Sequence, residues 1–325
     1  MPDPFTHYIF GQKVLEQLPP PIRQTIRADV FDRALQGPDP FSCLGFYGGK
    51  RRSMRNRSGI MHKQRTGTFL LEIAREAQNE PSPALFSFLA GFLCHYALDR
   101  TAHPYIIGKG GESFGDAATL PYRSGHVRLE RAIDCRYLRA YFKKEPWKTF
   151  FPRLIFKAKQ YPEELRGPLD RIFREVYGWE QSFDTFNAAL RDEAVFYRVM
   201  QDPWGIIRFL LRPLRTKKTL YAVYSYYKRE IDSAQVDYVN ESHAPWHHPF
   251  APEQRFEASF SELFEQSLGD ATAMIDAAFR YVFLKEPVGL EDVFQDKNYS
   301  TGLDCHDPRN QALPCCEPFS FHYKG

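Results

Sequence analysis

Apolar residues recur at spacings of three and four along most of this 325-residue chain. That period is typical of α-helices that pack one face on a core. Stretches rich in proline and glycine, such as PPP at 19–21, GPDP at 37–40 and EPSP at 80–83, separate the periodic segments and mark helix ends. The pattern predicts helices at residues 8–18, 22–36, 60–78, 84–102, 126–142, 165–177, 181–200, 217–232 and 254–283.

No stretch shows the strict alternation of polar and apolar residues that indicates a half-buried strand. We therefore expect an all-α fold with one main domain, residues 1–284. Residues 285–325 are rich in proline, asparagine and aspartate. We expect them to form an irregular C-terminal extension that packs on this domain or acts as a lid.

The composition allows a large core but identifies no partner. Hydrophobic residues make up 43% of the chain and aromatic residues 15%, and the net charge of +3 is too small to indicate nucleic acid or membrane binding. The longest apolar run, Ala84–Cys94, is shorter than the ~18 residues of a membrane span. The N-terminus lacks the basic start and apolar stretch of a secretory signal, so we expect a cytoplasmic protein.

Directly after that apolar run, the chain places His95, Asp99 and His103 four residues apart. Residues at this spacing lie on one face of a helix, whereas Arg100 points about 100° away around it. A buried aspartate usually becomes neutral, pairs with a cation or coordinates a metal. We expect the helix to end at Pro104, because proline disfavours helical geometry in the preceding residue.

Further candidate metal ligands lie in four other segments. His126 and Glu130 are four residues apart on a predicted helix, and both side-chain types suit zinc. His62 lies near a helix start, Asp39 in the turn GPDP, and His7 near the N-terminus. Taken singly, each has a simpler interpretation: a hydrogen-bonded core histidine, a turn aspartate or a solvated His/Glu pair. Together, the eight side chains predict a cage for several metals.

The order of these residues resembles the zinc-dependent phospholipase C family, whose fold is shared with single-strand-specific zinc nucleases. The series is His7, Asp39, His62, His95, Asp99, His103, His126 and Glu130. The resemblance covers residues 2–142, and the remainder matches only as helical. It implies a multi-helix bundle with an irregular C-terminal tail, and two to three zinc ions, or other divalent metals, in one cleft.

The resemblance also implies how the ligands are shared. Asp39, His62, His95 and Asp99 would hold one metal, and Asp99 would bridge to a second that His7 and the N-terminus also bind. The third metal would be held by the remaining three side chains, which are His103, His126 and Glu130. The position of Asp99 between two histidines on one stripe indicates a bridging carboxylate independently.

Two features depart from the family pattern. The step from Asp99 to His103 is shorter than in the secreted enzymes, which places the third metal in question. Secreted members also expose their metal-binding amine by cleavage of a signal peptide, and none is expected here. We expect Pro2 to take that role after removal of Met1, with Met1 or Asp3 as alternatives.

The implied activity is hydrolysis of phosphate esters. Two bridged metals would present a hydroxide for in-line attack, and a third would neutralise charge on the phosphate. Asp39 is the candidate that orients or deprotonates the water. The expected substrate is a phosphate ester such as a phospholipid head group, and nucleic acid is expected only as a substrate.

Candidate substrate contacts lie outside the ligand series. Arg52 and Arg55 belong to a basic run at 49–59 that either captures phosphate or forms a solvated loop. Tyr105, with Phe46, Tyr47 and Tyr122, would stack on bases or line a head-group pocket. The alternative functions are therefore a single-strand nuclease or nucleotidase, and a non-catalytic, metal-stabilised helical binding protein. The number of ligands disfavours the binding protein, because a structural zinc needs only four.

Two smaller clusters allow further metal sites. Cys305, His306, Cys315 and Cys316 lie near the C-terminus, where a plain loop with free thiols is the alternative interpretation. Three histidines lie in the stretch SHAPWHHPF, where a surface loop is the alternative, namely His243, His247 and His248.

Overall fold

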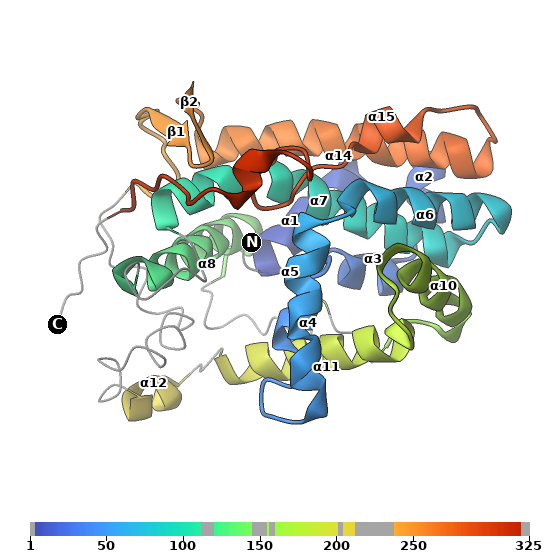
Figure 1. Cartoon of the computed structure of the whole chain (residues 1–325), viewed down its shortest axis with the longest axis horizontal. Helices are drawn as coiled ribbons and strands as arrows, with labels where there is room; N and C mark the ends of the chain where they lie inside the picture. Colours follow the sequence, from blue (N-terminus) through green and yellow to red (C-terminus); the bar gives the residue numbers. More distant parts are fainter. Residues whose placement is uncertain are drawn as a thin grey trace.

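The computed structural model of the chain describes residues 4–111, 120–144, 155, 160–200, 204–211 and 237–319. Helices make up most of this part (Figure 1), which confirms the predicted all-α class. The α-helices are α1 Pro4–Gln17, α2 Pro20–Thr25, α3 Ala28–Ala34, α4 Pro40–Cys43, α5 Asn56–Lys63, α6 Thr66–Asn79, α7 Pro83–Gly110, α8 Leu120–Phe142, α10 Arg166–Tyr177, α11 Ser182–Met200, α12 Ile206–Leu211, α14 Phe260–Phe283 and α15 Leu290–Phe294. The 3₁₀ helices are η1 Lys50–Arg55, η4 Glu163–Leu165 and η7 Pro308–Gln311. The predicted helix at 217–232 lies outside the described residues.

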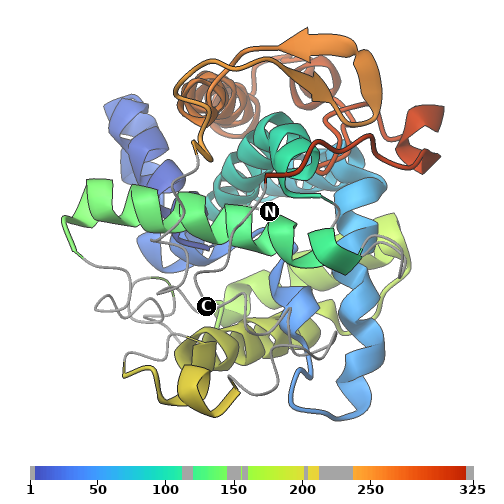
Figure 2. The same cartoon turned by 90° about the vertical axis from the view of Figure 1, so that its left-hand side faces the viewer.

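Helix α7 forms the centre of the molecule. Ser82 caps its start by accepting the N–H of Leu85 at 3.3 Å, and Pro83 occupies the first turn. Nearly every residue of α7 is buried, because α14, α3, α8, α6 and α1 all pack against it. Figures 1 and 2 show α14 along one side of α7 and α8 across another. The helix that carries the His95 stripe is therefore shielded from solvent along almost its whole length.

The prediction that Pro104 ends this helix is wrong, since α7 continues to Gly110. A proline inside a helix leaves the carbonyl of the residue four positions earlier without its N–H partner. Here Gly302, in the C-terminal segment, lies against the carbonyl of Arg100, and a Cβ at Gly302 would stand 2.3 Å from that oxygen. This tertiary contact covers the position that the proline disturbs.

Two predicted helices are each divided in two. The 60–78 segment is interrupted at Arg65, whose φ of 53° is left-handed, and α6 begins directly after it. The first turn of α6 is capped by a distant side chain, because Asp296 accepts the N–H of Gly67 at 2.8 Å and the hydroxyl of Thr66 at 2.9 Å. Similarly, the 22–36 segment forms α2 and α3.

A small antiparallel hairpin was not predicted. Strands β1 (Trp246–His248) and β2 (Ala251–Phe256) pair, and the rings of Trp246 and Phe256 stack at 4.7 Å. Three residues are too few to show a strand period. The last long helix consequently begins at Phe260, not at residue 254, and a capping box of Ser259 and Glu262 fixes its start.

Between α14 and residue 319, where the described part ends, the chain contains α15 and η7 and otherwise irregular backbone. Figure 1 shows this segment, in red, lying along the helices near the middle of the molecule. None of the described helices is long and apolar enough to cross a membrane. The domain boundary at residue 284 stays a prediction.

Candidate metal centre

Helix α7 presents His95, Asp99 and His103 on one stripe in the protein interior. Asp99 is fully buried, with Oδ2 at 3.3 Å from Nε2 of His95 and 3.6 Å from Nδ1 of His103. Both imidazoles thus face the carboxylate that separates them in the sequence.

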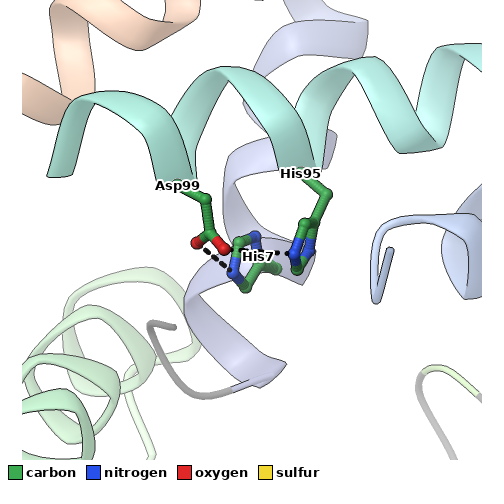
Figure 3. A group of neighbouring side chains, drawn as sticks. All are labelled: His7, His95 and Asp99. Carbon is green, nitrogen blue, oxygen red and sulfur yellow. Dashed lines mark ion pairs between the residues drawn. The ribbon is translucent and has the colours of Figure 1, made fainter. Parts of the chain in front are cut away.

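The first of three ligand groups combines this stripe with α1. Nε2 of His7 lies 3.3 Å from Oδ1 of Asp99, and the rings of His7 and His95 stack with centroids 4.1 Å apart. Figure 3 shows the two α7 side chains pointing to the same side of the helix, toward His7. The three residues offer ligand atoms close enough together to hold one metal ion.

The second group brings in the turn before α4 and the last turn of α5. Nε2 of His62 lies 3.1 Å from Oδ1 of Asp39 and 3.7 Å from Oδ2 of Asp99. Nε2 of His95 lies 3.8 Å from the same Asp39 oxygen. His95 therefore belongs to both groups, and Asp99 of the first group lies beside His62 of the second.

The third group combines the end of the stripe with α8. Nε2 of His126 lies 2.9 Å from Oε1 of Glu130, and Nε2 of His103 lies 3.7 Å from that oxygen. Because the other nitrogen of His103 faces Asp99, the three groups form one continuous buried cluster. The structure thus brings together the eight predicted side-chain ligands, while Pro2 lies outside the described residues.

Three of the imidazoles have one nitrogen bound to a backbone carbonyl. Since a carbonyl can only accept, the Nδ1–H groups are the donors. These bonds run from His62 to Ser58 at 2.7 Å, from His95 to Leu35 at 3.0 Å and from His126 to Gly111 at 2.9 Å. When such a ring is neutral, its Nε2 carries a lone pair, and in all three it faces the cluster. Metal-binding histidines are typically oriented in this way.

Several atoms that face the cluster have no other partner. Within the described residues, buried atoms without a hydrogen bond include both ring nitrogens of His7, Nε2 of His62 and His95, Oδ1 of Asp39 and both carboxylate oxygens of Asp99. Buried polar groups normally find partners, because leaving them unpaired costs free energy. Acceptor atoms gathered at this spacing fit a cation, and nitrogen and carboxylate oxygen are ligands that zinc accepts.

For four of the side chains, the electrostatics favour the protonation states that metal ligands need, and His95 is the exception. Burial lowers the pKa of His7, and it lowers the pKa of His103 to about 4. Burial alone would raise the pKa of Asp99 and Glu130, but the imidazoles beside them outweigh it, leaving Asp99 well below its usual value and Glu130 at about 2. Burial likewise opposes protonation of His95, but the carboxylates beside it raise its pKa.

Residues that the sequence did not single out position these ligands. Gly37 has a left-handed φ of 51°, and a Cβ there would lie 2.4 Å from the His95 ring, so only glycine lets the turn approach this closely. Asp134 of α8 accepts both the N–H and the hydroxyl of Thr6 at 2.6 and 3.0 Å. This contact fixes the start of α1 immediately before His7.

The predicted substrate arginines lie on η1, which continues directly into α5. Arg55 donates to the carbonyl of Leu44 at 2.7 Å, whereas Arg52 is exposed. Arg52 precedes His62 by ten residues along these two consecutive helices, which separates their backbones by about 15 Å. Contact between Arg52 and a substrate at the centre stays a prediction.

Tyr105 is a core residue rather than a surface for substrate. Its side chain is fully buried, its ring packs against Trp246 at 5.3 Å, and its hydroxyl donates to the carbonyl of Tyr238 at 3.0 Å. Because the ring is enclosed, the predicted substrate role of Tyr105 is corrected to packing.

The two smaller clusters do not form metal sites in the described part of the chain, where only the three groups above are suitably spaced. Cys305 lies against Thr66, while the backbone of Cys315 bonds to Pro249, and both cysteines are free thiols. His248 uses both ring nitrogens in hydrogen bonds to Thr301 and Phe250. The loop interpretation is confirmed for the C-terminal cysteines and for His243. It is wrong for His247 and His248, which belong to strand β1.

Comparison with known proteins agrees with this geometry. Residues 6–183 match the family model described as zinc dependent phospholipase C, a span that includes the eight ligands and more than half of the chain. No curated protein and no solved structure matches the chain. Because the match covers more than half of the chain, the chain belongs to the zinc-dependent phospholipase C family.

Proposed function

We propose that this protein is a zinc-dependent hydrolase of phosphate esters that acts in the manner of a phospholipase C. The observation that carries this proposal is the convergence of eight buried ligands into three groups of three. Structural zinc sites are closed by four protein ligands, whereas catalytic sites use three and keep a position open. Three open groups side by side suit a reaction centre better than a structural one.

When bound, zinc would make a water nucleophilic at neutral pH and would offset negative charge on the phosphate. The role of Asp99 is to hold the neighbouring groups together, because its Oδ1 faces His7 and its Oδ2 faces His62, His95 and His103. His103 also reaches Glu130, so the third group lies next to the other two. One phosphate can therefore be contacted from several sides.

Asp39 is our candidate for accepting the proton of the attacking water. Its side chain lies 3.1 Å from His62 and retains 11% exposure, while the Asp99 side chain has none. A base must lie within hydrogen-bond reach of the proton it takes. Of the two carboxylates that face His62, Asp39 is the one with exposed side-chain surface that water can approach.

Pro2 is our candidate for a further ligand of the first group. Helix α1 begins at Pro4, which puts His7 at the end of its first turn. The expected outcome is removal of Met1 in metal-loaded protein, checked by intact-mass analysis together with metal content. Full metal content with Met1 retained would exclude Pro2.

The function is tested by metal analysis followed by assays on a phosphocholine ester, a chromogenic phosphodiester and single-stranded DNA. We expect turnover of the first two, and His243→Gln, which changes an exposed imidazole outside the centre, serves as the matched control. Preferential cleavage of DNA would favour the nuclease alternative. Full metal content without turnover of any substrate would favour the non-catalytic binding protein.

A further inference from the structure

Tyr299, in the C-terminal segment, contacts two of the imidazoles directly. Its N–H donates to the carbonyl of His62 at 2.9 Å, and its ring lies 5.2 Å from the ring of His62 and 5.7 Å from that of His95. We propose that Tyr299 is a positioning residue that holds both imidazoles of the second group in their ligating orientation. This inference rests on the proposed metal centre.

The backbone contact of Tyr299 is made to the C-terminal end of α5. The last carbonyls of a helix have no partner within it, and His62 occupies the last turn of α5. Tyr299 supplies the missing donor, and its ring covers the imidazole of the same residue. Both the backbone and the side chain of His62 are thereby restrained.

The loop that carries Tyr299 is held rigidly by its own hydrogen bonds. Oδ1 of Asn298 accepts the N–H of Ser300 at 2.8 Å, and the carbonyl of Asn298 accepts the N–H of Gly302 at 2.8 Å. Gly302 has a left-handed φ of 67° and lies against the Arg100 carbonyl. A turn built in this way presents Tyr299 at a defined place.

The loop is also anchored to the helix that carries the ligands. The hydroxyl of Tyr96 donates to the carbonyl of Phe294 at 3.0 Å and accepts the N–H of Lys297 at 2.9 Å. Arg100 donates to the same Phe294 carbonyl at 3.1 Å. Tyr96 and Arg100 directly follow His95 and Asp99 in the sequence. The same turns of α7 therefore present ligands to the centre and hold the segment that covers it.

The consequence is selective. Loss of the Tyr299 ring frees His62 and His95 to adopt other orientations, and residues that orient metal ligands typically contribute about 10- to 100-fold to metal affinity. The group of His103, His126 and Glu130 is held by α7 and α8. One metal should therefore weaken while another is retained.

The test is a Co²⁺ titration of metal-free protein, followed by absorption spectroscopy and competition with a chelator. We expect Tyr299→Ala to weaken one Co²⁺ by at least about 10-fold and to change the spectrum, with another ion bound as in the wild type. Tyr299→Phe keeps the ring and the backbone N–H, so its Co²⁺ affinity and absorption spectrum should match those of the wild type. Tyr161→Ala opens a comparable cavity at a fully buried tyrosine elsewhere, and should lower the unfolding midpoint without changing Co²⁺ affinity.

The results separate this inference from the proposed function. Wild-type protein that binds no Co²⁺ or Zn²⁺ would overturn both. Wild-type binding with an unchanged Tyr299→Ala titration and spectrum would overturn only the role of Tyr299, as would an equal loss of affinity in Tyr161→Ala. If Tyr299→Ala fails to fold, Tyr299→Leu, which fills more of the cavity, takes its place with the same expected outcomes.

Discussion

Asp99 lies within 3.7 Å of an imidazole from each of the three groups. It is fully buried, and apart from these imidazoles its two oxygens have no hydrogen-bond partner among the described residues. A single side chain that borders every group is the point at which the metal positions depend on one another.

We therefore expect Asp99→Ala to lose two metals at once and to lower phosphodiester hydrolysis by at least about 100-fold. Elemental analysis of the purified variant and a chromogenic assay measure the two effects. Asp292→Ala, which removes an exposed carboxylate on α15, is the control. Retention of full metal content in Asp99→Ala would remove the bridging role.

His248 makes stability depend on pH. Burial lowers its pKa, its Nδ1 accepts the N–H of Phe250 and its Nε2–H donates to Thr301. A second proton on the His248 imidazole therefore binds more readily in the unfolded chain. The contribution of His248 to folding stability is thus present above about pH 6.5 and is lost as the pH falls. We expect His248→Leu to lower the free energy of unfolding by about 1–2 kcal/mol at pH 7.5 and by less at pH 5. Urea unfolding of both proteins from pH 5 to 7.5 measures this difference in free energy. A difference that does not change with pH would contradict the role given to His248.

At the scale of elements, α7 combines two tasks in one helix. It carries three of the eight ligands, and it continues past Pro104 to Gly110, where α8 approaches closely enough that a Cβ at Gly110 would lie 2.7 Å from His126. The register between α7 and α8 places His103 opposite Glu130. It thus depends on α7 remaining helical beyond Pro104. The contact with Gly302 is part of what permits this.

We expect Gly302→Ala to destabilise the protein by more than about 1 kcal/mol, because its φ is left-handed and the added Cβ would meet the Arg100 carbonyl. The control is Gly269→Ala, at a glycine of α14 where a Cβ meets nothing within 4 Å. That substitution should stabilise by about 0.5–1 kcal/mol. Chemical unfolding compares the two, and changes of equal sign would contradict the role given to Gly302.

At the scale of the whole molecule, the candidate metal centre lies where α1, α5, α7 and α8 and the turn before α4 meet. A cation bound there stabilises the folded state by an amount that grows with the logarithm of its free concentration, about 2.7 kcal/mol at 100 times its dissociation constant. Removal of the metal leaves imidazole nitrogens and carboxylate oxygens facing one another in the interior without the cation, and several of these buried atoms have no hydrogen-bond partner.

A chelator should therefore lower the thermal unfolding midpoint by several degrees, at about 2–4 °C per kcal/mol for a chain of a few hundred residues. Added zinc should restore the midpoint. Asp99→Ala should show a smaller response because it has less metal to lose. Differential scanning calorimetry measures these shifts, and a midpoint unaffected by chelator would contradict metal binding at this centre.

His95, Asp99 and His103 could be found from a local pattern, because polar side chains stand out at helical spacing beside an apolar run. The candidates in other segments were weak singly and became convincing only as an ordered set. The hairpin at Trp246, the break at Arg65 and the burial of Tyr105 could not be found from a local pattern. The break and the burial depend on contacts with residues far away in the chain, since Arg65 precedes a helix start capped by Asp296, and Tyr105 packs under the hairpin. The hairpin is local, but its first strand is too short to show a strand period. The cytoplasmic location and the substrate arginines stay predictions.

By itself, the sequence determined the helical class and proposed the candidate ligands. The helical period places residues four apart on one face, and charge on a buried face requires partners. Only the tertiary structure decided that α1 and α5 bring His7 and His62 to Asp99 of α7, and that Tyr299 lies against His62 and His95. Such contacts join residues far apart in the chain. They depend on how whole helices pack, including the passage of α7 through Pro104, and no local pattern encodes that packing.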